Sequence, residues 1–130
     1  MKGRFLLDTN VLIWLLSSSN RLPPRVKRML SRSDSSLTVS VASVWEIILK
    51  HQAGKLQLGA PLAQILDQVL YHSPWTMLPL ASEHLPVLDG LPMLHKDPFD
   101  RLLIAQAQYE GLTVVTADQQ IPRYAVETLW

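Results

Sequence analysis

The sequence predicts an α/β fold of three layers, α/β/α, with a short-stranded and mostly parallel central sheet. Short apolar segments alternate along the chain with longer segments of helical periodicity. The short segments are apolar at consecutive positions, as in strands that are buried on both faces. The 130 residues, 48% of them hydrophobic, are enough for one core and too few for two. We therefore expect a single domain over residues 1–130.

In the first half of the chain, the expected helices carry recognisable start and stop signals. Strands and helices are expected there at residues 5–7, 11–16, 23–31, 37–39 and 40–53. The polar loop 17–20 ends the first helix. Pro23 and Pro24 suit the first turn of the second, where a missing N–H is harmless. Ser40 is a good N-cap for the third, and Gly54 suits the position after its end.

The second half repeats this alternation. Helices and strands are expected at residues 61–72, 75–80, 82–88, 98–110 and 112–116. Asp97 as N-cap, Pro98 at the first helical position and Asp100 two residues later mark the clearest helix start, and Gly111 marks its end. The tail from residue 121 to residue 130 fits either an edge strand or a cap over the core.

Composition excludes several classes of protein. The formal charge of +1 gives no bulk field for nucleic-acid binding, so a polyanion would have to be bound locally. The absence of cysteine excludes disulfides, thiol nucleophiles and Cys-type zinc sites, and makes a cytoplasmic location the default expectation. The apolar segment near the N-terminus is interrupted by Asp8 and Asn10 and is too short for a signal or a membrane span.

Acidic side chains follow the expected strands. Asp8 comes directly after strand 5–7, and Asp118 follows strand 112–116. Since the carboxyl ends of parallel strands meet at one edge of a sheet, both acids should lie there. Asp100 is in the first turn of its helix and shares a face with Leu103 and Ile104, so its carboxylate can reach the same edge.

Glu46 interrupts an otherwise apolar helix. A helical wheel gathers the apolar residues of this helix on one stripe, formed by Val41, Val44, Trp45 and Ile48. Glu46 falls outside that stripe, beside Ser43 and Lys50, and should face a cleft or the solvent.

Each acid also has a structural explanation. Asp8 can be an N-cap, Asp118 can start a turn, and Glu46 can pair with Lys50 at i+4. For Asp97, the N-cap role is favoured over a functional one. Three other groups are also expected in structural roles. The histidines at 51, 72, 84 and 95 should be exposed or packed, and the basic residues at 25, 27, 28 and 32 should form a solvated face. The tryptophans at 14, 45, 75 and 130 should lie in the core or an interface.

The coincidence of the acids is more informative than any one of them. Carboxylates that crowd one edge of a sheet cannot all stay ionised without a cation. Oxygen ligands without a Cys, and without His residues at zinc-type spacing, select Mg²⁺ or Mn²⁺. This chemistry is typical of nucleases and phosphoryl-transfer enzymes.

Four segments carry a resemblance to PIN-domain ribonucleases, and closely to the VapC toxins of toxin–antitoxin pairs. They are residues 6–14, 43–47, 95–107 and 115–118, and the run DPFDRLLIAQA is the most specific of them. The resemblance implies a PIN-like fold and a Mg²⁺- or Mn²⁺-dependent endoribonuclease. It also implies a homodimer that is inhibited by a VapB-type antitoxin.

The resemblance also implies roles for individual residues. Asp8 and Asp100 would be direct metal ligands, Glu46 would hold or deprotonate a water, and Asp118 would complete the charge. Asn10 and Thr116 would be supporting polar residues, and Asp97 is near enough to contribute through water.

Three other classes of protein are alternatives to this interpretation. A dehalogenase-like phosphatase needs a second Asp where Asn10 stands, and a receiver-type phosphoacceptor needs paired N-terminal acids and a late Lys-Pro that the sequence lacks. The remaining alternative is a non-catalytic PIN-like module that binds RNA or protein, although a scaffold without activity has no reason to keep mutually repelling carboxylates together.

Overall fold

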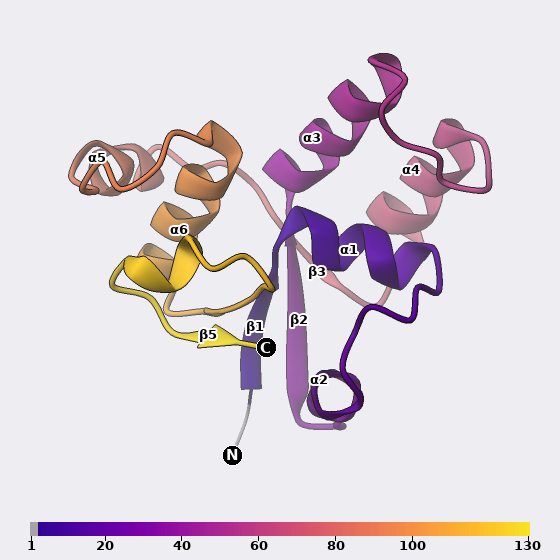
Figure 1. Ribbon diagram of the computed structural model, residues 1–130, viewed down its shortest axis with the longest axis horizontal. Coiled ribbons are helices and arrows are strands. Elements are labelled where there is room, and N and C mark those ends of the chain that lie inside the picture. The colour runs from indigo at the N-terminus through magenta and orange to yellow at the C-terminus, as the bar shows by residue number, and fades with distance from the viewer. Residues whose placement is uncertain (1–2) are drawn as a thin grey trace.

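A five-stranded sheet forms the centre of the molecule, in the strand order β3-β2-β1-β4-β5 (Figure 1). The computed structural model describes residues 3–130. Every pair of neighbouring strands is parallel. The elements are β1 (Gly3–Leu7), α1 (Thr9–Leu16), α2 (Pro24–Leu30), β2 (Ser35–Ser40), α3 (Val41–Gln52), α4 (Leu62–Tyr71), β3 (Thr76–Leu78), α5 (His84–Asp89), α6 (Pro98–Glu110), β4 (Thr113–Val115), η1 (Ile121–Arg123) and β5 (Thr128–Leu129).

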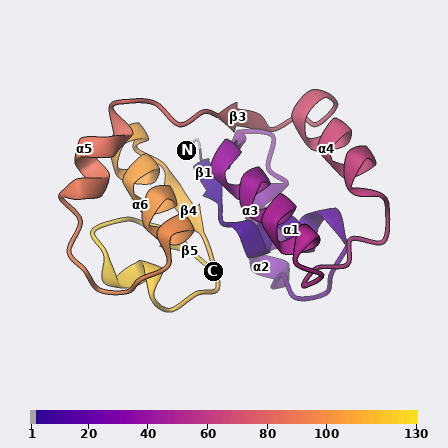
Figure 2. The same cartoon turned by 90° about the horizontal axis from the view of Figure 1, so that it is seen from above.

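Helices cover both faces of this sheet (Figure 2). Side chains alternate along β1, so that Phe5 and Leu7 pack into one core with residues of α1 to α4. Leu6 points the other way, into a second core with residues of α6 and η1. The sheet therefore divides the core expected from the length of the chain into two parts. Because both faces are buried, the strands are apolar at consecutive positions. The expected three-layer α/β/α fold is confirmed.

The helix boundaries follow the expected capping chemistry. Asp8, Ser40 and Asp97 are the N-caps of α1, α3 and α6, and each side chain accepts a backbone N–H of the first turn. Gly111 ends α6 with φ of 70°, a left-handed conformation that glycine adopts without a steric penalty. The tail was expected to be either an edge strand or a cap over the core, and it contains both. Strand β5 pairs with β4, and Tyr124 is buried in the second core.

The predicted apolar stripe of α3 is wrong at two of its four positions, although Val44 is buried and Ile48 packs against the core. Val41 and Trp45, assigned to the stripe, have 43% and 55% of their surface exposed. The helix contacts both α1 and α6, so its buried side is broad and contains Ser43 and Glu46 beside Ala42, Val44 and Ile47. Tertiary contacts on two sides thus override the simple amphipathic pattern.

Two further expectations concern the surface. The basic residues at 25, 27, 28 and 32 are all exposed, as expected for a solvated face. The histidines differ from one another: His51 and His72 are exposed, whereas His84 is fully buried. No helix within residues 3–130 has the length and apolar character needed to cross a membrane.

Candidate functional site

The carboxyl edge of the sheet has a switch point between β1 and β4. From β1 the strand order proceeds in one direction through β2 to β3 and in the other through β4 to β5. Ligands of open parallel sheets bind where the order diverges in this way. Asp8 directly follows β1, and Asp118 follows β4, so these two acids flank the switch point.

A pocket of about 70 Å³ lies at this edge. We call it the acidic pocket, and it is lined by Asp8, Thr9, Asn10, Glu46, Lys50, Asp97, Asp100 and Asp118. The structure therefore brings together the four acids singled out in the sequence, with Asn10 and Asp97. Thr116 is buried at the end of β4, and its Oγ1 accepts the backbone N–H of Asp118 at 2.9 Å.

The structural roles of Asp8 and Asp118 are compatible with a place in the acidic pocket. Asp8 Oδ1 accepts the N–H of Val11 at 2.8 Å and so caps α1. Asp118 Oδ1 accepts the N–H of Gln120 at 2.8 Å and so starts a turn. These contacts fix the position of each carboxyl group, and both groups still line the pocket.

Glu46 lies in the pocket on the buried side of α3, with 8% of its surface exposed. Its Oε2 is 3.1 Å from Lys50 Nζ, as the i+4 pairing predicted. Its Oε1 is a buried oxygen that has no hydrogen-bond partner among residues 3–130. A buried acceptor without a donor costs free energy, so this atom is suited to receive a water, a cation or a ligand donor.

The electrostatics of the acidic pocket favour the binding of a cation. Burial, together with the negative charges of the neighbouring acids, raises the pKa of Asp100 to about 8; these acids are Asp97, Asp118, Asp8 and Glu46. Burial also raises the pKa of Asp8, although hydrogen bonds from Thr116 and Val11 oppose the rise. A divalent cation would stabilise the ionised form of both groups.

The donor set fits Mg²⁺ or Mn²⁺, but the side chains do not converge on one point. Within residues 3–130, no group of three or more His, Asp or Glu side chains is arranged to hold a metal ion. The four acids supply only hard oxygen donors, and Glu46 Oε1 is unpartnered. The pocket has room for an ion with about one or two waters, at ~30 Å³ per water. Cation binding would therefore require some side chains of the pocket to move closer to the ion.

The sequence did not predict the contact of His95 with Asp100. His95 Nε2 lies 3.3 Å from Asp100 Oδ2, and His95 Nδ1 lies 2.7 Å from the hydroxyl of Tyr124. The position of His95 five residues before Asp100, just ahead of α6, was a usable signal. The contact with Tyr124 joins residues that are 29 positions apart, and no sequence signal indicates it.

A second polar cluster also went unrecognised. His84 accepts the backbone N–H of Ala81 at Nδ1 and lies 2.9 Å from Glu110 through Nε2. Gln106, which is fully buried, accepts the hydroxyl of Ser40 at 2.6 Å and so ties α6 to the end of β2. These bonds satisfy buried polar groups on the α5/α6 side of the sheet.

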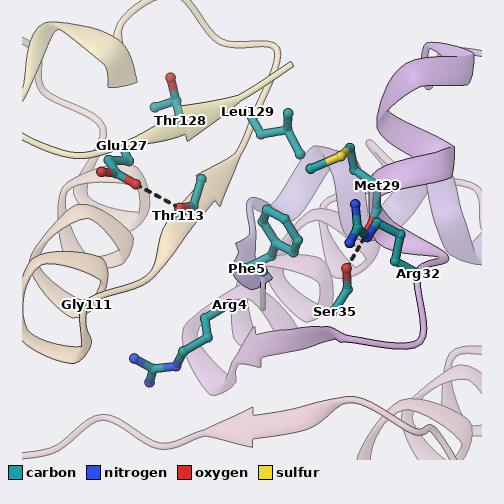
Figure 3. Close-up of a pocket in the computed structure, with 11 residues that line it drawn as sticks. Arg4, Phe5, Met29, Arg32, Ser35, Gly111, Thr113, Glu127, Thr128 and Leu129 are labelled. Atoms are coloured by element: carbon teal, nitrogen blue, oxygen red, sulfur yellow. Dashed lines mark hydrogen bonds between the residues drawn. The ribbon is translucent and has the colours of Figure 1, made fainter. Parts of the chain in front are cut away.

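A larger cavity, of about 430 Å³, lies at the opposite edge of the sheet (Figure 3). It is bordered by the side chains of Arg4 and Arg32 and by the first residues of four strands, which are Gly3, Ser35, Thr113 and Thr128. The lengths of the strands separate this cavity from the acidic pocket, so the two are distinct features.

Fold and site together define a small α/β domain with a carboxylate-lined pocket at the switch point of a parallel sheet. The family model of the PIN domain matches residues 5–127. The chain therefore belongs to the PIN-domain family. The sequence has no significant match among curated proteins.

Solved structures share this fold at low sequence identity. A chain of VapBC2 from Rickettsia felis, bound to a DNA fragment from their promoter, is 16% identical with a TM-score of 0.72, over 97% of both chains. A chain of FitAcB from Neisseria gonorrhoeae is 23% identical with a TM-score of 0.66, over 97% of this chain and 96% of the other. A chain of a toxin–antitoxin complex from Klebsiella pneumoniae is 16% identical with a TM-score of 0.64, over 96% and 95%.

Proposed function

We propose that this chain is a VapC-type toxin, a divalent-metal-dependent endoribonuclease that hydrolyses phosphodiester bonds of RNA in the cytoplasm. One observation carries the proposal: four carboxylates from separate parts of the chain line one pocket at the switch point of the sheet. Burial and the repulsion of neighbouring carboxylates raise the pKa of Asp100, and a bound cation would relieve both effects.

The residues of the acidic pocket have distinct proposed roles. Asp8 and Asp100 would bind Mg²⁺ or Mn²⁺, and Asp118 would add negative charge. Glu46 would hold or deprotonate the attacking water, for which its unpartnered Oε1 is available. A bound cation of this type polarises a phosphodiester and lowers the pKa of water.

Three further residues would support the carboxylates. Thr116 fixes the backbone of Asp118 through Oγ1 and donates to Asp8. Asp97 caps α6 and so places Asp100 in its first turn. Asn10 lines the pocket from α1 and is exposed, so it can contact a substrate or a metal-bound water.

The test is cleavage of single-stranded or looped RNA by the purified chain, with Mg²⁺, with Mn²⁺ and with EDTA. We expect cleavage that needs the metal and that Asp8→Asn and Asp100→Asn each abolish. If both variants cut RNA as fast as the parent chain, the proposed chemistry is wrong. Absence of saturable Mn²⁺ binding in calorimetry near neutral pH would favour the alternative, a PIN-like module that binds RNA or protein without cutting.

The proposal includes two partners. One structural neighbour is described as a toxin–antitoxin complex and another as VapBC2, which supports a VapB-type antitoxin for this chain. A small gene directly upstream is the candidate for it, and its co-expression should relieve growth arrest caused by this chain. The chain is further proposed to form a homodimer, which light scattering of the purified protein would reveal as a mass twice that of the monomer.

A further inference from the structure

A chain of hydrogen bonds leads away from Asp100. His95 Nε2 lies 3.3 Å from Asp100 Oδ2, and His95 Nδ1 lies 2.7 Å from the Tyr124 hydroxyl. Arg101 Nη1 donates to the same hydroxyl at 3.2 Å. The side chains are shielded from solvent: Tyr124 is 4% exposed and Arg101 is 9% exposed. Water therefore competes little for the bond between Arg101 and Tyr124.

The contacts of Tyr124 determine which nitrogen of His95 carries the proton. The Tyr124 oxygen accepts two N–H donors, the backbone N–H of His95 at 3.2 Å and Nη1 of Arg101. A phenol has one hydrogen of its own to donate. Its remaining partner is His95 Nδ1, so the hydroxyl donates to this nitrogen, which must be unprotonated. In a neutral imidazole the proton is then on Nε2, which donates to Asp100 Oδ2.

We propose that His95, fixed in its Nε2–H tautomer by Tyr124, is a positioning residue that sets the rotation of the Asp100 carboxyl group for cation binding. The proposal rests on the proposed function of Asp100 as a metal ligand. Asp100 stands in the first turn of α6, where its backbone is fixed by the Asp97 cap. The cap leaves the carboxyl group free to rotate, and the N–H of His95 restricts that rotation. Hydrogen bonds of this kind orient metal-binding carboxylates and raise metal affinity.

The tautomer can be measured without metal or substrate. Two-bond ¹⁵N–¹H correlation spectra of the imidazole rings distinguish Nε2–H from Nδ1–H. At about pH 8, where an ordinary imidazole is neutral, we expect His95 as the Nε2–H form, with the exposed His51 as an internal reference. Observation of the Nδ1–H form in the parent chain would overturn the proposal.

The effect on the metal site is measured by Mn²⁺ titration of folded variants. His95→Leu should lower Mn²⁺ affinity about 10–100-fold. His95→Gln keeps an N–H near the position of Nε2 and should recover most of this loss. Tyr124→Phe keeps the ring in the core, removes only the hydroxyl, and should lower the affinity less than His95→Leu. The matched controls His51→Leu and Tyr71→Phe alter exposed residues outside the network and should leave the affinity unchanged.

A kinetic readout separates positioning from simple loss of structure. In His95→Leu, the Mn²⁺ concentration for half-maximal RNA cleavage should rise, while the rate at saturating Mn²⁺ stays close to that of the parent chain. Equal affinity in His95→Leu and the parent chain would overturn the inference, provided that Asp100→Asn still loses Mn²⁺. If Asp100→Asn also binds Mn²⁺ as the parent does, the proposed function of Asp100 fails with it.

Discussion

Lys50 Nζ lies 3.1 Å from Glu46 Oε2, inside a pocket whose other charged side chains are all carboxylates. The two residues are one turn apart on α3, so the pairing is set by the helix itself. The ammonium group of Lys50 offsets part of the negative charge of the pocket. A bound cation would place a second positive charge close to it. Lys50 therefore stabilises the metal-free pocket and competes electrostatically with a bound ion.

Removing this charge should strengthen metal binding. We expect Lys50→Gln to raise Mn²⁺ affinity roughly three- to tenfold, the effect of one unit charge at several ångströms in a partly solvated pocket. Calorimetric titration at low ionic strength measures it, with Lys55→Gln as a control at an exposed position outside the acidic pocket. Weaker Mn²⁺ binding in Lys50→Gln would show instead that Lys50 is needed to hold Glu46 in place.

Substitution of Asp8 separates its two roles. Asn is as good an N-cap as Asp, so Asp8→Asn should keep α1 intact while abolishing RNA cleavage. Asp8→Ala should be equally inactive. Because it also loses the bond to the N–H of Val11, its free energy of unfolding should be about 1 kcal/mol lower than that of Asp8→Asn. Urea unfolding of the two variants gives this difference. Equal stability would mean that the cap contributes nothing measurable to the fold.

The same comparison applies to Asp97, whose functional role is open. Its Oδ1 accepts the N–H groups of Phe99 and Asp100, so Asp97→Ala should be about 1 kcal/mol less stable than Asp97→Asn. The charge of Asp97 also contributes to the raised pKa of Asp100, so Asp97→Asn should lower that pKa toward its usual range. NMR titration of the Asp100 carboxyl carbon measures the shift. An unchanged titration curve would contradict the electrostatic coupling of the two acids.

The sequence predicted those features that depend on local chemistry or on topology alone. The bounds of α6 follow from Asp97, Pro98 and Gly111, which cap or break a helix wherever it packs. The approach of Asp8 to Asp118 follows from parallel strands ending at one edge. The position of a carboxylate that follows a parallel strand can therefore be predicted from the sequence.

Features that depend on packing between distant segments were not predictable. The exposed position of Trp45 results from α3 contacting helices on two sides, which no helical wheel contains. The hydrogen bond between His95 and Tyr124 joins the segment before α6 to the tail of the chain. The sequence did not decide whether this tail is an edge strand or a cap over the core. Periodicity carries no information about such pairs, because they are set by tertiary structure.

The raised pKa of Asp100 predicts how the stability of the metal-free protein changes with pH. The folded carboxyl group keeps its proton up to about pH 8, whereas the unfolded one releases it near its usual value of 3.8. Between these values the folded state binds more protons, so the free energy of unfolding should fall as the pH rises. Asp8 acts in the same direction, since its pKa is also raised.

Urea unfolding in EDTA, at several values between about pH 5 and pH 8, measures this slope. Asp100→Asn should be less sensitive to pH than the parent chain and more stable than it near pH 8, because the amide needs no proton to remain neutral. Excess Mn²⁺ should reverse the trend in the parent chain, because a cation favours the ionised carboxylates. The same pH slope in Asp100→Asn and the parent would show that Asp100 titrates normally, and would remove the electrostatic argument for a cation in the acidic pocket.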